Sequence, residues 1–336
     1  MRVHRRIAFT LSAVALLATA ACGGNAVETS GDSGDSSTPA TSDGGDTTPS
    51  STDTGGSTDN GSLTLSGQDF TEMQIMASMY EQVLSKAGYD VTTKLVQTRD
   101  IYVEQMTDGN VDVVPEYLAG ITDFLNTAAH GDDAKTVSTH DPKTTIAALK
   151  PLATKANISV LEPSQATDQN AFFVTKDFAD QNNLTTLSDL AAMNQPITLA
   201  AGADCAGRSD CEAGLQDVYG LDITKIIPTG FGGAATLKSV TDGESQLGES
   251  GTTDGSLDAQ GLVLLEDDKG IQPAQNLTPA VNSDFLKAHP DIADTLNKLS
   301  ATLTTDDLAQ LNLQVIAERQ KPEDVAQAYL SDKGLI

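Results

Sequence analysis

The sequence predicts an α/β fold in which short parallel strands are covered by helices. From residue 63 onward, short apolar segments alternate with segments whose apolar residues recur at helical spacing. The earliest of these segments follow a strand, helix, strand order, which is typical of parallel sheets. The chain has 336 residues, of which 39% are hydrophobic, so it is long enough for two domains with a core each.

The first elements are expected between residues 63 and 117. They are a strand at 63–67, a turn at 68–70, a helix at 71–87, a strand at 90–96, a helix at 101–106 and a strand from 111 that ends at Tyr117. The helix that starts at Thr71 is expected to begin with a capping box of Thr71 and Gln74 and to end at Gly88.

The later elements are expected in the same alternation. Strands are predicted at 170–175, 197–201, 223–227 and 261–265. Helices are predicted at 184–193, 234–240, 290–303, 305–316 and 322–330. Ligands of open α/β sheets bind at the carboxyl ends of the strands. We therefore expect the site in the loops at Gln68, Tyr117, Arg208 and Thr253.

Residues 1–22 have the features of a secretory signal. Arg2, Arg5 and Arg6 precede an apolar run, and small residues lead to Cys22. This end resembles the lipobox of bacterial lipoproteins, in which the cysteine is acylated and becomes the new N-terminus. We expect a lipid anchor on Cys22 that holds the protein at the outer face of the bacterial cell membrane. The alternative is an ordinary signal peptide that is cleaved close to Cys22.

Residues 23–62 are predicted to form a disordered tether. They are rich in Ser, Thr, Gly and Asp, with acidic residues and no basic ones. Such a segment cannot bury enough apolar surface to fold alone. Hydration and charge repulsion keep it extended, so it would hold the following domain away from the membrane.

The charge and the cysteine content exclude several classes of function. A net charge of −27 makes nucleic acid an improbable partner, because phosphate contacts require clustered Lys and Arg. Three cysteines and four scattered histidines form no dense set of metal ligands. We therefore expect no metal site and no cofactor.

Several motifs resemble those of one family of binding proteins. The segments 66–72 (SGQDFTE) and 111–117 (VDVVPEY) are similar to the opening segment and the Pro-Glu-Tyr strand of the glycine betaine/choline-type substrate-binding proteins of ABC importers. The segments 168–174, 186–190, 214–220, 252–255 and 263–268 agree with that family in the same order. The resemblance extends over the whole chain from about residue 63 to 331.

The resemblance implies a two-lobed, type II periplasmic-binding-protein (Venus flytrap) fold with a hinge. Lobe one would consist of residues 63–165 and 270–336, and lobe two of residues 166–269. The protein would be a monomeric, lipid-anchored receptor, not an enzyme. It would capture a quaternary ammonium compound between the lobes and deliver it to the permease subunits of the importer.

Aromatic side chains are expected to hold the ligand. A quaternary ammonium group has no N–H to donate, so aromatic ring faces are the remaining way to bind it. The chain has no Trp. The resemblance makes Tyr117 the first aromatic wall and Phe172 a second one, although Phe172 could equally lie in the core. Phe231, between two glycines, is a further candidate, whereas Tyr219 fits the core better.

Polar contacts are expected from three further residues. The resemblance places Arg208 where an arginine binds a ligand carboxylate, for which a guanidinium group is well suited. The alternative is that Arg208 pairs with Asp204 or Asp210. Gln68 and Thr253 could donate neutral hydrogen bonds to the ligand, or could simply be turn residues.

Cys205 and Cys211 are expected to form a disulfide. They enclose five residues and are predicted to lie outside the cytoplasm, where disulfides persist. The bond would stiffen the loop that carries Arg208.

Two alternative functions are considered, and the first follows from a departure from the family pattern. Residues 118–120 (Leu-Ala-Gly) replace a Thr-Gly-Thr segment, which would make the aromatic cage sparser. The receptor could then accept a bulkier or planar aromatic solute. A surface-anchored hydrolase is the alternative of another class, but Ser250 lacks the strand, elbow and helix context of a nucleophile.

Overall fold

The computed structural model describes residues 60–131 and 133–336. The predicted signal peptide, Cys22 and nearly all of the predicted tether lie outside these residues. The last predicted tether residue, Ser62, is the first residue of a strand. In the described part of the chain, we find no helix with the length and apolarity that crossing a membrane requires.

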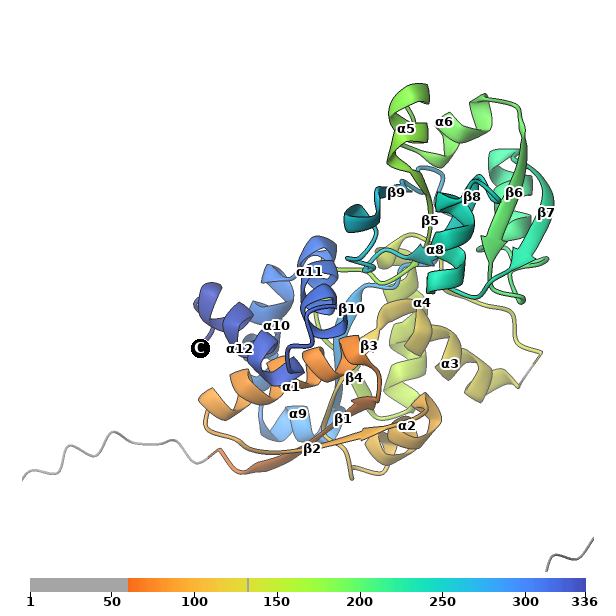
Figure 1. Ribbon diagram of the computed structural model, residues 1–336. Helices are drawn as coiled ribbons and strands as arrows, with labels where there is room; N and C mark the ends of the chain where they lie inside the picture. Colours follow the sequence, from red (N-terminus) through yellow and green to blue (C-terminus); the bar gives the residue numbers. More distant parts are fainter. Residues whose placement is uncertain (1–59, 132) are drawn as a thin grey trace, which may run out of the picture. The chain divides into compact units, whose positions relative to one another are not determined.

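The first sheet has five strands and is mixed (Figure 1). Its strands, in spatial order, are β2 (Asp90–Val96), β1 (Ser62–Gln68), β3 (Val113–Tyr117), β10 (Leu277–Asn282) and β4 (Ile158–Val160). Strands β1, β2 and β3 are parallel, as predicted. Strand β10 enters from late in the sequence and pairs antiparallel with both β3 and β4.

The second sheet also has five strands and is mixed. Its spatial order is β7 (Asp222–Pro228), β6 (Pro196–Ala201), β8 (Leu247–Gly251), β5 (Asn170–Thr175) and β9 (Leu262–Leu265). Strands β6, β7 and β8 are parallel, whereas β5 is antiparallel to both of its neighbours. The prediction of parallel sheets is therefore wrong for β5 and β10, since the chain crosses between the two sheets immediately before each of these strands.

Each of the predicted helices is present, with bounds that differ by a few residues. The helices around the first sheet are α1 (Thr71–Lys86), α2 (Arg99–Thr107), α3 (Leu118–His130), α4 (Pro142–Lys155), α9 (Ser283–Ala288), α10 (Asp291–Thr302), α11 (Thr305–Ile316) and α12 (Pro322–Asp332). Those around the second sheet are α5 (Lys176–Asn182), α6 (Leu187–Ala192), α7 (Glu212–Gly214), a π-helical turn (Leu215–Tyr219), α8 (Ala234–Thr241) and a 3₁₀ turn (Asp258–Gln260). The sequence analysis did not predict α3, α4, α5 or α9.

The predicted capping box at the start of α1 is wrong. The N-cap residue is Phe70, one position before Thr71, and no side chain caps the helix. The side chain of Gln74 instead donates to Oδ1 of Asp69 at 2.7 Å. A hydrogen bond to the loop after β1 therefore stabilises the first turn of α1.

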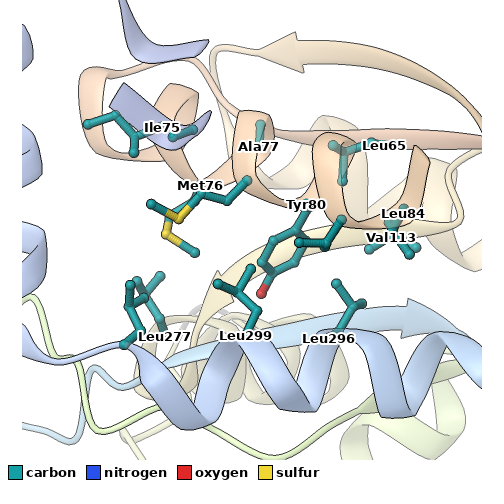
Figure 2. Packing of buried hydrophobic residues seen from close by; sticks show 14 of the residues in the cluster. Leu65, Ile75, Met76, Ala77, Tyr80, Leu84, Val113, Leu277, Leu296 and Leu299 are labelled. Carbon is teal, nitrogen blue, oxygen red and sulfur yellow. The ribbon is translucent and has the colours of Figure 1, made fainter. Parts of the chain in front are cut away.

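Apolar side chains are buried on both faces of the first sheet. Because successive residues of a strand point to opposite faces, Val113 joins the apolar cluster under α1, whereas Val114 joins the cluster under α3 and α4. Figure 2 shows the first cluster, in which Tyr80 of α1 packs among apolar side chains such as Leu296 and Leu299 of α10. Burial of these side chains fixes α1, and with it the residues at its first turn.

The core of the second sheet follows the same rule. Phe172 and Phe173 of β5 are both fully buried, and they belong to clusters on opposite faces of the sheet. Strand β8 contains Gly248, where a Cβ would lie 2.3 Å from Cζ of Phe173. Only glycine lets the phenylalanine ring pack this closely, which explains why the sequence of β8 did not predict a strand.

The predicted disulfide is present. Cys205 and Cys211 are bonded to each other and are fully buried in the core of the second sheet. The loop that they close carries Arg208, as expected.

Candidate functional site

Tyr117 at the end of β3 is held by a buried hydrogen-bond network. Its side chain is 8% exposed, and its hydroxyl donates to Oε1 of Glu72 at 2.5 Å. Glu72 lies in the first turn of α1 and is 4% exposed. Its other oxygen, Oε2, accepts from Nδ2 of Asn312 on α11 at 2.7 Å. Three elements that are distant in the sequence therefore fix the orientation of this phenol ring.

A second ring lies beside Tyr117. The side chain of Phe70 stacks on it with ring centroids 6.5 Å apart and an angle of 13° between the planes. Phe70 is 39% exposed, so this pair presents an accessible aromatic surface next to the buried network. Its position follows from the loop after β1, which makes Phe70 the N-cap residue of α1.

Residues from the second sheet reach the same network. Thr253 follows β8 and is buried, and its hydroxyl donates to Oδ1 of Asp168 at 3.1 Å. Its backbone oxygen lies 3.4 Å from Nδ2 of Asn312. Asn312 therefore links the Glu72 carboxylate to the loop that follows β8.

A cavity of about 300 Å³ lies beside these contacts. Its lining residues include Asp168, Phe231, Ser250, Thr253, Asp254, Asn312 and Ile316. Phe231 is 54% exposed, so its ring is available to a ligand. Asn312 is 7% exposed, and its Oδ1 makes no hydrogen bond to any residue that the structure describes. An amide oxygen that is buried without a partner usually marks a place for a ligand or a water molecule.

The site has a negative electrostatic character. Burial raises the pKa of Tyr117 well above its usual value, and the charges of Glu72 and Asp168 act in the same direction. Burial and then the charge of Glu72 raise the pKa of Asp168 to about 7, although the Thr253 hydroxyl opposes this rise. Within the described ranges, no Lys, Arg or His forms an ion pair with Glu72 or Asp168. A positively charged ligand would therefore balance the charge of these carboxylates.

Arg208 is engaged by its own loop. Its guanidinium donates through Nε and Nη2 to the two carboxylate oxygens of Asp210 at 2.9 and 2.7 Å, and through Nη1 to Asp204 at 2.7 Å. The hydrogen bonds to Asp210 raise the pKa of Arg208. The structure thus shows the ion pairs that the sequence analysis considered as the alternative to ligand binding.

The remaining predicted residues do not line the cavity of about 300 Å³. Gln68 ends β1, is half-buried and makes no side-chain hydrogen bond within the described chain. Phe172 is 1% exposed in the core of the second sheet and also borders a separate cavity of about 530 Å³. Its burial favours the core interpretation. Tyr219 also lies in that core, where its hydroxyl donates to Asp267 at 2.5 Å.

A further cavity lies far from the predicted residues. It measures about 410 Å³ and is lined by α4 and β4, with residues such as Leu149, Pro151 and Val160. Neither this cavity nor the one of 530 Å³ is bordered by Phe231 or Thr253, which both line the cavity of about 300 Å³. Volume alone therefore does not single out the candidate site, whereas convergent polar groups and a ring face favour the cavity of about 300 Å³.

The described chain contains one group of side chains with metal-ligand spacing, namely Cys205, Cys211 and Glu249. The disulfide occupies both sulfur atoms, so the group offers no thiolate to a metal.

Sequence reasoning missed four residues of the network: Phe70, Glu72, Asp168 and Asn312. Phe70 and Glu72 belong to the motif at 66–72, and Glu72 is a carboxylate on the otherwise apolar face of α1. That mismatch is a signal that could have identified Glu72. No local pattern marks Asn312, because its partner lies 240 positions earlier.

The chain matches one family of known proteins. Residues 61–332 match the model of the substrate-binding domain of the ABC-type glycine betaine transport system. The match covers most of the chain, so the chain belongs to this family. It is therefore a substrate-binding protein of an ABC importer that acts outside the cytoplasm, in a family of binding proteins and not of enzymes.

Individual relatives agree with this family. The chain is 28% identical over 274 residues to the glycine betaine-binding protein YehZ of Escherichia coli, covering 79% of this chain and 88% of that protein. It is 26% identical over 267 residues to the carnitine transport binding protein OpuCC of Listeria monocytogenes, covering 77% and 83%. The solved structure of apo YehZ covers 82% of this chain and 99% of its own, with 26% identity and a TM-score of 0.70. These matches confirm the predicted α/β two-lobed periplasmic-binding fold.

Proposed function

We propose that this chain is the lipid-anchored receptor of an ABC importer and captures quaternary ammonium compounds of the glycine betaine and choline type. Family membership supports the receptor role. The named ligands of its relatives, glycine betaine and carnitine, support the ligand class. The observation that carries the proposal is the stacked pair of Phe70 and Tyr117 beside an acidic network that has no basic partner among residues 60–131 and 133–336.

The chemistry of the ligand explains why this arrangement suits it. A quaternary ammonium group cannot donate a hydrogen bond, and a cation over an aromatic face gains roughly 0.5 to 2 kcal/mol. Tyr117 is fixed in orientation by Glu72, so its ring needs no ordering when the ligand binds. Phe231 would add a third ring from the loop after β7.

Polar residues would complete the site. Thr253 would offer its hydroxyl to the ligand from the second sheet, and Gln68 its amide from the first. Arg208 would bind a ligand carboxylate only after giving up bonds to Asp204 or Asp210. Glycine betaine would use this contact, whereas choline has no carboxylate to offer.

Capture would involve closure of two lobes, with residues 63–165 and 270–336 in lobe one and residues 166–269 in lobe two. Support comes from the two segments that connect the sheets, which lie side by side. Thr167 bridges Asn276, and the backbone N–H of Asp168 donates to the carbonyl of Gln275 at 3.2 Å. Two adjacent crossings are a suitable hinge, and a trapped ligand would shift the equilibrium toward the form that the permease recognises.

The lipid anchor would be attached at Cys22. Replacement of this residue, Cys22→Ser, should release the protein from membranes of an expressing bacterium into the soluble fraction. A protein that stays with the membrane despite Cys22→Ser would contradict the anchor. Ser33→Ala, in the predicted tether, is the control that should leave the protein on the membrane.

A thermal-shift screen tests the ligand class. The soluble protein from residue 23 onward should be stabilised by choline, glycine betaine or carnitine, because a ligand that binds only the folded state stabilises it by mass action. Ectoine and planar aromatic solutes are the comparison set. Stabilisation by planar aromatics alone would overturn the quaternary ammonium class and favour the bulkier ligand class instead.

A further inference from the structure

A buried carboxylate, Glu72, and a half-buried one, Asp168, lie at the site, and no Lys, Arg or His of the described chain forms an ion pair with either. Glu72 enters from α1, and Asp168 from the segment between β4 and β5. Burial raises the pKa of Asp168, and the negative charge of Glu72 raises it further. Like charges in a buried site disfavour ionisation of both groups at once. The carboxyl of Asp168 therefore holds a proton in part of the empty protein near neutral pH.

The other groups around the pair do not neutralise it. Tyr117 from β3 donates to Glu72, Asn312 from α11 donates to Glu72, and Thr253 donates to Asp168. All three groups are neutral hydrogen-bond donors.

The neighbouring charges are already bound elsewhere. Glu116 of β3 is paired with Arg99 at 2.8 Å, so this base is not available to the pair. Asp254 borders the cavity and accepts from the hydroxyls of Ser250 and Ser256. Asp69, at the start of α1, is exposed and accepts from Gln74 and Gln97.

A second observation points to a ligand at this place. Asn312 is more than nine-tenths buried and borders the cavity of about 300 Å³, yet its Oδ1 has no partner in the described chain. The acceptors that converge here are the buried carboxylate of Glu72, the half-buried carboxylate of Asp168 and this amide oxygen. All of them favour a positively charged occupant.

We propose that capture of a cation is linked to release of a proton from the carboxyl of Asp168, which lines the cavity of about 300 Å³, so that the site prefers a net cation to a zwitterion. The O–H bond of the protonated carboxyl breaks, the proton passes to water, and the bound cation takes over as counter-charge. This inference rests on the proposed function, since it concerns the same site. It assigns Glu72 and Asp168 a role in specificity that the sequence analysis did not give them.

The sign of the pH dependence follows from the linkage. A proton and the cation compete for the carboxylate of Asp168, so binding of the cation weakens as the pH falls. With the pKa of Asp168 at about 7 in the empty protein, the dissociation constant for choline should fall about 50-fold between pH 5 and pH 7. Glycine betaine brings its own carboxylate to the site, so its dissociation constant should change at least several-fold less.

Isothermal titration calorimetry on the soluble protein from residue 23 onward tests this inference. Choline and glycine betaine are titrated at pH 5, 6, 7 and 8, in pairs of buffers with different ionisation enthalpies, which gives the number of protons released. We expect close to one proton released per choline at pH 6. Asp168→Asn should abolish the pH dependence of choline binding. The exposed Asp258→Asn, which changes the net charge equally, should preserve it.

Three results would overturn the inference. They are a choline dissociation constant that varies less than twofold between pH 5 and pH 7, no proton release in the wild-type protein, and an equal pH dependence for the two ligands. The number of protons released is measured on the wild-type protein, so it tests the inference even if Asp168→Asn does not fold. Absence of binding by either ligand at every pH would instead contradict the proposed function, and this inference with it.

Discussion

The two sheets hold their candidate binding residues in different ways. At the end of β3, Tyr117 is buried and is fixed through Glu72 by α1 and α11. After β6 and β7, Arg208 and Phe231 lie in loops where Arg208 is bound only by acids of its own loop and Phe231 is more than half exposed. The first sheet therefore presents a preformed wall. The second presents groups that can rearrange, as expected of a receptor that closes on its ligand.

Loss of the preformed wall should have the largest effect. Tyr117→Ala should weaken choline binding about 10- to 100-fold, because it removes a ring worth 1 to 3 kcal/mol with its fixed orientation. Tyr117→Phe keeps the ring and should cost less, which separates the ring from the hydrogen bond to Glu72. Calorimetric titration measures both variants. Unchanged affinity in Tyr117→Ala would show that this residue is not part of the site. It would also contradict the claim that the first sheet presents a preformed wall.

The disulfide is what restrains the loop of the second sheet. Replacement of Cys205 and Cys211 by serine should lower the free energy of unfolding by about 2 kcal/mol, because the unfolded chain regains the freedom of a small loop. Urea denaturation of the double variant measures this loss. The exposed Ser209→Ala in the same loop should leave stability unchanged. Equal stability of the double variant and the wild-type protein would mean that the loop is held by its ion pairs alone.

Arg208 tests whether the second sheet adapts to the ligand. Arg208→Ala should weaken glycine betaine about tenfold and choline less than twofold, because only the former has a carboxylate to bind. Lys225→Ala, an exposed residue on β7, is the control with the same change in charge. Competition binding at constant ionic strength gives both ratios. Equal losses for the two ligands would show that Arg208 only binds Asp204 and Asp210.

The ring of Phe231 should contribute least. Because it is 54% exposed, Phe231→Ala should weaken choline only about two- to fivefold, the range of a cation–π contact that is open to water. Val218→Ala, a similarly exposed apolar residue, should change nothing. The same titration measures both. A loss as large as that of Tyr117→Ala would reverse the comparison and make the second sheet the preformed wall.

The sequence predicted the parts of the fold that depend on local pattern. Periodicity identified α1 and α11 and strands such as β1 and β2, and the Pro-Glu-Tyr motif marked the strand that ends at Tyr117. Strands β4, β8 and β10 were missed. In β8 and β10, Gly248 and Pro279 disfavour strands locally. Their formation depends on tertiary contacts such as the packing of Gly248 against Phe173.

The candidate site was harder to predict than the fold. The residues that hold Tyr117 come from positions 72 and 312, and no local pattern connects them. For Arg208, the sequence was compatible with ligand binding and with pairing to nearby acids. Only the structure shows that the guanidinium binds Asp204 and Asp210 in the empty protein. Buried polar networks are thus the part of a binding site that sequence patterns reveal least.

A crystal structure of the protein with choline is the most direct test of the proposal that Tyr117 and the loops of the second sheet enclose a quaternary ammonium. The account predicts the trimethylammonium group within about 6 Å of the Tyr117 ring centroid, with Thr253 or Phe231 on its other side. Choline bound only in the cavity between α4 and β4, away from Tyr117, would contradict it.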